Sequence, residues 1–450
     1  MLTIPGKGKI KKFFSNHVVV FTVVVLVSFI LYLLNAPLDF RKNLETGTYR
    51  RLLTSYDITS NTFLPYEIIR NHRFSFGKES VAAMRVAEAS KTLPHSLIFV
   101  NGRYVPSYPI VSGLIALPVY FVPLSLGKIP NLDTPQRILG VLMLGRVAAS
   151  FYTAIAVGIF YLVLRKFATL KKMKTGGWVY VFLFFYAFAT NVYSISSRGL
   201  WQHVPALLFN SLIILLLLYS AERKSLVKWT GLLCGLAFLA RPTNIFFIVP
   251  VAIFVFLKYR SEFIKFVLMG MPMAVFYLVY NYVTFGSPLT NEYVARNDTS
   301  FSSPIWEGLL GYLVSPARSF LFITPPLVLS YYGMWKLFRA KSRDHIDTLL
   351  TLLSVAFLAT VVMYSAWWCW YGADRFGYGF FTEWLSLLSL LVFPFMVRIK
   401  GWGKILLVIL AAYSFYTQFN AVVYRKSRCN KDHNWDFYCL KPGMFSEQEY

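Results

Sequence analysis

The sequence predicts an all-α polytopic membrane protein with about eleven transmembrane helices and a structured first external loop. Of its 450 residues, 56% are hydrophobic and only 14% are charged, which is far from the average of soluble proteins. Apolar runs of about 18 residues or more recur along the chain, and that length spans the hydrocarbon core of a bilayer. Aromatic residues gather near the ends of the runs, as in "AWWCWYG" (Ala366 to Gly372), where their rings favour the membrane–water interface.

The formal net charge is +25. Nucleic-acid binding is the usual interpretation of such a charge in a soluble protein, but here the cations are dispersed between apolar segments. Lys and Arg collect in the cytoplasmic loops of membrane proteins, which explains part of the excess. We therefore expect membrane lipids, and no nucleic acid, as partners.

The first apolar run, Val18 to Leu34, follows a basic start and carries no clear cleavage site, so it is interpreted as an uncleaved signal anchor. The next strongly basic stretch, "RKFATLKKMK", should also be cytoplasmic. An even number of crossings must separate the two. Only one of the apolar runs between them, 108–126 and 138–164, can therefore cross the membrane.

The run 108–126 contains Pro109, Pro118 and Pro123, and prolines interrupt the hydrogen-bond ladder of a helix. It is predicted to be a proline-broken interfacial or re-entrant segment, so residues 37–137 form one external loop. Within that loop, Lys78 to Lys91 is predicted as a short helix capped by Ser80. Leu97 to Pro106 is predicted as a hairpin, since Asn101-Gly102 favours a type I′ turn.

The later runs alternate across the membrane, and each boundary is uncertain by several residues. They are expected at 177–190, 204–219, up to Arg241, directly after Arg241, 266–282, 320–335, 349–368, 384–397 and 405–416. This divides the chain into a transmembrane domain, 1–420, and an external tail, 421–450. The tail holds Cys429 and Cys439, which could form a disulfide outside the cell.

This topology gathers many ionisable side chains on the external face, although cations are disfavoured in short external loops. An anionic ligand would explain them, because the guanidinium group of Arg binds phosphate through a rigid fork of donors. Each Arg could instead snorkel or pair with a carboxylate, and His203 could be an interfacial anchor or a ligand contact. His72 and His95 are expected to be solvated. The gathered residues include Asp57, Glu67, Arg198, His203, Arg241, Arg318 and Arg375.

The chain resembles the GT-C superfamily of integral-membrane glycosyltransferases, in particular the protein O-mannosyltransferases and the transferase that adds aminoarabinose to lipid A. The segments that carry the resemblance span most of the chain and follow the family's order. They include "SYDITSNTFLPYEIIR", "YPIVSGLIALPVY", "SSRGLWQHVPALL", "GLAFLARPTNIFFIVP", "LLGYLVSPARSFLFITPP" and "AWWCWYGADRFGYG".

The resemblance implies a polyprenyl-phosphate sugar donor, a site at the outer leaflet and a catalytic base in the first loop, which here is Asp57. The resemblance leaves the acceptor open among a lipid, a glycan and a protein, and we expect the location to be the bacterial inner membrane with the site facing the periplasm or exterior. Many relatives carry a second acid where this chain has Trp201, Gln202 and His203, which leaves a need for Mg or Mn open. A further expected departure from the family is that no large soluble domain of the kind found in several relatives follows the last apolar run.

The predicted reaction is an inverting transfer of one sugar, with Asp57 as base and positive charge to stabilise the departing phosphate. The candidate phosphate ligands are Arg198, Arg241, Arg318, Arg375 and His203, and the candidate acceptor or sugar ligands are Glu67, Tyr56 and Tyr108. An O-antigen ligase or polymerase would use a diphosphate-linked glycan and no base at Asp57. A lipid-linked sugar flippase or transporter would need charged residues within the spans, and Arg146 is the exception there.

Overall fold

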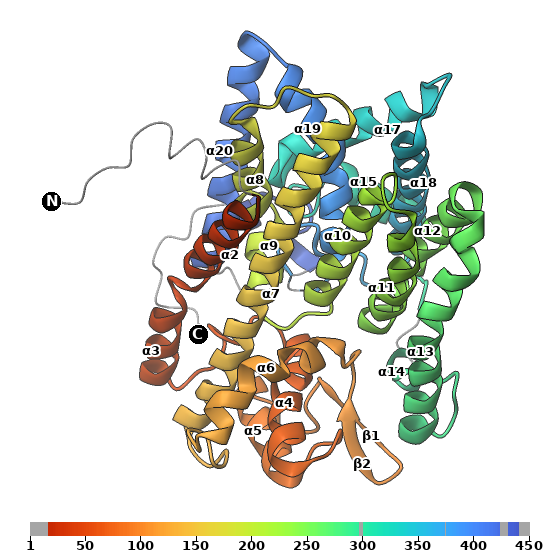
Figure 1. Cartoon of the computed structure of the whole chain (residues 1–450). Coiled ribbons are helices and arrows are strands. Elements are labelled where there is room, and N and C mark those ends of the chain that lie inside the picture. The colour runs from red at the N-terminus through yellow and green to blue at the C-terminus, as the bar shows by residue number, and fades with distance from the viewer. Residues whose placement is uncertain (1–16, 297–299, 374, 424–430, 441–450) are drawn as a thin grey trace, which may run out of the picture.

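The computed structural model describes residues 17–296, 300–373, 375–423 and 431–440. In this part of the chain the molecule is a helical membrane protein with one small hairpin (Figure 1). Six described helices are long and apolar enough to cross a membrane, or seven if the pair around a 43° bend at 189–190 makes one span. Several shorter apolar helices accompany them, so the chain is a multi-pass integral membrane protein.

Every predicted apolar run corresponds to one helix or to two or three consecutive helical segments. The helices outside the first loop are α2 (His17–Leu33), α7 (Pro135–Leu170), α8 (Trp178–Phe188), α9 (Asn191–Ser194), η2 (Ser196–Arg198), α10 (His203–Tyr219), η3 (Lys224–Leu226), α11 (Val227–Ala240), η4 (Pro242–Asn244), α12 (Ile245–Lys258), α13 (Arg260–Phe285), α14 (Glu292–Ala295), α15 (Ile305–Val314), α16 (Phe320–Ile323), η5 (Pro325–Val328), α17 (Leu329–Arg339), α18 (His345–Ser365), η6 (Gly379–Trp384), α19 (Leu385–Arg398), α20 (Trp402–Val423), η7 (Lys431–His433) and η8 (Tyr438–Leu440).

The first loop folds into α3 (Ala36–Thr46), η1 (Tyr56–Ile58), α4 (Thr59–Asn71), α5 (Lys78–Glu88), the antiparallel strands β1 (Leu97–Val100) and β2 (Arg103–Pro106), and α6 (Val111–Ser125). These elements cover one end of the helix bundle, at the bottom of Figure 1. Asn101 and Gly102 both have positive φ, 52° and 72°, as the predicted type I′ turn requires. The predicted hairpin and the short helix before it are confirmed, but Gly77 rather than Ser80 is the N-cap of α5.

Two helix predictions need correction. The segment predicted to be broken by proline is one continuous helix, α6, which runs through Pro118 and Pro123. Conversely, the single helix predicted over 320–335 is divided into α16, η5 and α17 at Thr324 and Pro325. A proline at the start of a new helical segment needs no amide hydrogen bond, which is why the break falls there.

Close helix packing explains some of the small residues. A Cβ atom at Gly231 of α11 would lie 1.9 Å from the carbonyl oxygen of Phe266 in α13, so only glycine fits at this crossing. Most of the remaining surface of α13 is exposed, as expected for a helix that faces lipid. At the other end of the chain, α20 extends to Val423, past the predicted boundary at residue 420. Cys429 lies outside the described residues, so its disulfide with Cys439 stays a prediction.

Candidate active site

Asp57 lies where the first loop meets the membrane helices. It sits in the short turn η1, whose preceding residue Ser55 accepts a hydrogen bond from the Asp57 amide at 3.3 Å. One carboxylate oxygen, Oδ1, accepts a hydrogen bond from the Tyr108 hydroxyl at 2.7 Å, and the other, Oδ2, pairs with Nη2 of Arg375. Asp57 and Arg375 are 318 residues apart in the sequence. The fold thus brings together the predicted base and one of the predicted phosphate ligands.

The surroundings of Asp57 keep it charged. Burial raises the pKa of this carboxyl, but the positive charge of Arg375 and the hydrogen bond from Tyr108 outweigh burial and hold the pKa below its usual value. Burial, reinforced by the Asp57 charge, raises the pKa of Tyr108 well above its ordinary value. At neutral pH the site therefore contains an ionised carboxylate and a protonated phenol that donates to it.

His95 lies closer to Asp57 than predicted. Its Nε2 atom is 3.4 Å from the Tyr108 hydroxyl and 3.8 Å from Asp57 Oδ1, while 52% of its side chain remains exposed. The hairpin causes this proximity, because Leu97 pairs with Pro106 and the two strands therefore hold His95 and Tyr108 on adjoining segments. The predicted hairpin register was the sequence signal that could have identified His95.

Arg375 contacts two aromatic rings with its guanidinium group and the buried Arg318 with its backbone carbonyl. Its guanidinium carbon lies 4.6 Å from the centre of the Trp201 ring and 5.2 Å from that of Phe380. The backbone carbonyl of Arg375 accepts a hydrogen bond from Arg318. Arg375 therefore presents its charge to Asp57 from a fixed direction.

Arg318 serves that loop and does not reach Asp57 in the described contacts. Its side chain is only 1% exposed. It donates to the backbone carbonyls of Arg375 and of Ala373, the latter at 3.2 Å, and through Nε to Oδ1 of Asn434 at 2.9 Å. These contacts give Arg318 a supporting role in place of the predicted phosphate contact.

Arg241 and His203 form a layer behind Arg375. Arg241 pairs with Glu383 and also donates to the carbonyl of Phe380 at 3.1 Å. His203 lies between Glu383 and Arg375, with Nδ1 2.8 Å from Glu383 Oε2 and Nε2 3.5 Å from Nη1 of Arg375. Arg241 and His203 thus both belong to the site. They are linked to Asp57 by way of Arg375 and do not contact Asp57 directly in the described contacts. Glu383 is a member that the sequence analysis missed, because it reads as part of an apolar span.

Arg198 belongs to a different cluster. It is 1% exposed and donates to Asp39 at 2.9 Å and to Asn35 at 2.7 Å. Arg146 of α7 donates in turn to the carbonyl of Arg198 at 3.0 Å. The buried ion pair with Asp39 satisfies the charge of Arg198, so the structure does not place it as a phosphate ligand.

Glu67 and Tyr56 have different surroundings. Glu67 is fully buried and accepts hydrogen bonds from Asn71 at 2.8 Å, from Arg73 at 2.8 Å and from the amide of Gly77 at 3.0 Å. It therefore fastens the turn after α4, and the predicted sugar contact does not fit this burial. Tyr56 adjoins Asp57 and is 37% exposed, so it can still meet an acceptor.

A second cation approaches Asp57 from the segment after α13. The Arg296 guanidinium lies 5.1 Å from the centre of the Tyr108 ring. Tyr293 of α14 donates to Gln202 at 2.9 Å and meets the Tyr108 ring edge to face, with centroids 6.4 Å apart. This segment therefore forms one wall of the site. The string "NEYVAR", polar and just outside an apolar run, was the available signal.

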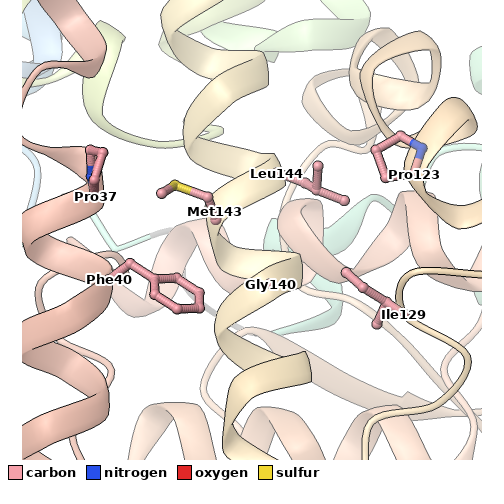
Figure 2. A pocket seen from close by; sticks show the side chains of 7 residues that line it. All are labelled: Pro37, Phe40, Pro123, Ile129, Gly140, Met143 and Leu144. Carbon is pink, nitrogen blue, oxygen red and sulfur yellow. The ribbon is translucent and has the colours of Figure 1, made fainter.

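A separate apolar cavity of about 410 Å³ lies between α3, α6 and α7. Figure 2 shows Pro37 and Phe40 on one side, Pro123 on the other, and Met143 and Leu144 of α7 between them. Tyr108 precedes the start of α6, whereas Pro123 is near its end. A helix of 15 residues is roughly 20 Å long. The cavity is therefore distinct from the polar centre around Asp57.

The described residues contain no group of three or more His, Cys, Asp or Glu side chains placed to hold a metal ion. Both oxygens of Asp57 already face donors, and Glu383 pairs with Arg241. Among the described residues, this donor set does not fit a divalent metal ion. Asp298 and Asp374 lie outside the described residues.

No family model matches the chain, and no curated protein sequence matches it. Among solved structures, the chain is similar to a crystal structure of ArnT from Cupriavidus metallidurans bound to undecaprenyl phosphate, with 13% sequence identity and a TM-score of 0.49. The similarity covers 91% of this chain and 65% of the other, so the chain spans less than two thirds of that protein's length. This is a likeness between folds.

Proposed function

We propose that the protein is an inverting glycosyltransferase of the GT-C type that moves one sugar from a polyprenyl-phosphate donor to a lipid, glycan or protein acceptor. The observation that supports it is the contact between the ionised Asp57 and Arg375, joined by Tyr108, at one end of a set of membrane helices. A base and a cation at the bilayer surface are what transfer from a lipid phosphate needs. The outer leaflet of a bacterial inner membrane is the proposed location.

In the proposed reaction, the acceptor oxygen bonds to the anomeric carbon of the sugar while the bond from that carbon to the phosphate oxygen breaks. The phosphate leaves with the electron pair, and the acceptor proton passes to Asp57. Arg375 stabilises the negative charge that develops on the phosphate. A single displacement inverts the anomeric centre, and an oxocarbenium-like transition state follows by analogy with glycoside hydrolysis.

Asp57 and Arg375 must partly separate for this reaction. A carboxylate whose pKa is lowered by a guanidinium group is a weak base. Once Arg375 turns its Nη2 group to a donor phosphate, Asp57 loses its strongest partner and becomes more basic. Donor binding would therefore prepare the base for the acceptor.

The groups around Arg375 complete the proposed phosphate site. The indole Nε1 of Trp201 is buried and has no hydrogen-bond partner among the described residues. A phosphate oxygen beside Arg375 could accept from it, with Arg296 as a second cation. Tyr56 is the proposed acceptor contact. The apolar cavity beside α3 and α7 suits the tail of a lipid-linked donor and not its head, because it is lined by apolar side chains.

The test uses purified protein with a synthetic polyprenyl-phosphate sugar and an acceptor extract. We expect wild-type transfer of a single sugar and a loss of at least about a hundredfold in Asp57→Asn. Asp133→Asn is the matched control, because Asp133 is another first-loop carboxylate paired with an arginine, but its side chain is 56% exposed. Unchanged turnover in Asp57→Asn would remove Asp57 from the mechanism.

The same assay separates the alternatives. A ligase or polymerase would move a preassembled glycan from a diphosphate carrier and ignore the monophosphate donor. A transporter would relocate the labelled lipid in proteoliposomes without forming a product. Transfer of a single sugar that depends on Asp57 is the result that the proposal requires.

A further inference from the structure

Arg375 is in contact with a buried pair, Glu383 and His203. These side chains belong to residues that are 2% and 1% exposed. Nδ1 of His203 lies 2.8 Å from Glu383 Oε2, and its Nε2 lies 3.5 Å from Nη1 of Arg375. Nη2 of Arg375 reaches Asp57. The contacts form one continuous line from Glu383 through His203 and Arg375 to the carboxylate.

The neighbours of His203 determine where its proton lies. Nδ1 of His203 lies 2.8 Å from Glu383 Oε2 and 3.0 Å from Nη1 of Arg241, which donates to the other oxygen of Glu383. We assign the ring proton to Nδ1, because two facing lone pairs at the shorter contact would repel each other. A second proton would create an imidazolium beside Arg241, whose Nη1 is 3.0 Å away, and beside Arg375. Two guanidinium groups disfavour that third charge. His203 is therefore neutral, with a proton on Nδ1 and a lone pair on Nε2.

We propose that Glu383 and His203 form a positioning pair that holds Nη1 of Arg375 and leaves Nη2 for Asp57 and the donor phosphate. This inference rests on the proposed function. Glu383 fixes the tautomer of His203, and the bare Nε2 accepts from the guanidinium. The rings of Trp201 and Phe380 lie 4.6 and 5.2 Å from the guanidinium carbon, and His203 adds a contact to Nη1 at 3.5 Å, so Nη2 is the end that can turn between Asp57 and the phosphate. Neither member of the pair contacts Asp57 in the described structure.

The first test compares two amides at position 203. In His203→Gln the amide reaches the former Nε2 position and can offer its oxygen to Arg375, whereas in His203→Asn it reaches only the Nδ1 position. We expect His203→Gln to keep donor kcat/KM within a few-fold of wild type and His203→Asn to lose about tenfold or more. Both variants remove the ring and leave an amide, and they differ in the ring nitrogen that the amide replaces and by one methylene group. Equal activity in the two variants overturns the proposal.

The second test, Glu383→Gln, reverses the tautomer. Arg241 can only donate, so the amide oxygen takes the position facing Arg241 and the amide nitrogen faces His203. That donor forces the ring proton to Nε2, where it opposes an N–H of Arg375. We expect a loss of donor kcat/KM of about tenfold or more, with protonated Nε2 in the variant. An unchanged tautomer together with unchanged kinetics contradicts the proposal.

The third measurement is made on the wild-type protein, and His203→Gln is needed only to assign the signal. Nitrogen NMR of the wild-type protein with labelled histidine reports the tautomer directly, and the signal missing in His203→Gln assigns it. A bare Nε2 with protonated Nδ1 supports the pair, and a protonated Nε2 in the wild type overturns it. Failure of the wild-type protein to transfer any sugar would contradict the proposed function and leave this tautomer result unaffected.

Discussion

At the scale of single residues, the central feature is the carboxylate of Asp57, which its neighbours keep ionised and at the same time make less basic. Asp57 is ionised because Arg375 and Tyr108 outweigh the effect of burial on its pKa. The same contacts weaken it as a base until another anion draws Arg375 away. Its activity and that of Arg375 are therefore coupled.

We expect this coupling to appear in the pH dependence of kcat/KM. In the wild type, the folded-state pKa of Asp57 lies below its usual value, so Asp57 stays ionised and contributes no acid limb above about pH 4. Arg375→Gln removes the main charge that lowers the pKa and leaves burial, the largest effect, opposed by the weaker contributions of Tyr108 and His95. The acid limb should then move upward by about one pH unit or more. Arg137→Gln, at an exposed ion pair, is the control; an acid limb at the same pH in Arg375→Gln would refute the coupling.

A second residue-scale prediction concerns Trp201. Trp201→Phe keeps an aromatic ring under Arg375 but removes the buried, unpartnered indole N–H. If that group donates to the phosphate, donor affinity should fall about tenfold, the effect of one hydrogen bond to a charged acceptor. Binding of a fluorescent polyprenyl phosphate measures it. Trp306→Phe is the control, since Trp306 is 66% exposed; equal affinities would exclude the indole contact.

At the scale of elements, the site depends on a loop held by its backbone. The carbonyls of Ala373 and Arg375 accept from Arg318, which reaches them from the segment between α15 and α16. The first loop contributes its part through ordinary local structure, the turn η1 and the hairpin. Such local structure could be predicted from short sequence patterns, as the turn at Asn101-Gly102 illustrates. The carbonyl partners of Arg318 could not be predicted, because every residue has a backbone carbonyl and the sequence does not distinguish them.

We expect Arg318→Lys to damage both stability and transfer. A single amino group cannot serve two carbonyls and Asn434 at once, so the loss should be roughly 1–3 kcal/mol of unfolding free energy. Thermal unfolding in detergent and donor turnover measure the two effects. Arg343→Lys is the matched control, because Arg343 also donates to two backbone carbonyls but is exposed. Equal unfolding temperatures for the two variants would contradict the supporting role.

At the scale of the whole molecule, the loops predicted to share one face do meet at one end of the bundle (Figure 1). The alternation of apolar runs with basic stretches was enough to predict this, since each crossing reverses the side. The alternation could not predict which charged side chains form ion pairs with one another. Arg198 finds Asp39 across 159 residues and Arg241 finds Glu383 across 142, and such pairs are set by helix packing. Two of the four expected arginine ligands were for this reason satisfied elsewhere.

The orientation of that end is a prediction of its own. We expect a cysteine at Phe99, which is exposed in the hairpin, to react with a membrane-impermeant thiol reagent on intact cells. A cysteine at Lys224, in the loop between α10 and α11, should react only after the cells are permeabilised. The parent chain controls for native thiols. The opposite labelling pattern would place the site on the cytoplasmic side.

The contact between Arg318 and Asn434 has a consequence for how the protein is made. Asn434 follows α20, the last apolar helix, and its carbonyl also accepts from Ser315 at 2.5 Å. During synthesis the helices enter the bilayer in sequence order, so Asp57 emerges long before Asn434. We therefore expect the newly inserted protein to have an incomplete reaction centre until Asn434 reaches the side of the membrane on which Arg318 lies. On this view, maturation depends on placement of that last segment as well as on insertion of the helices.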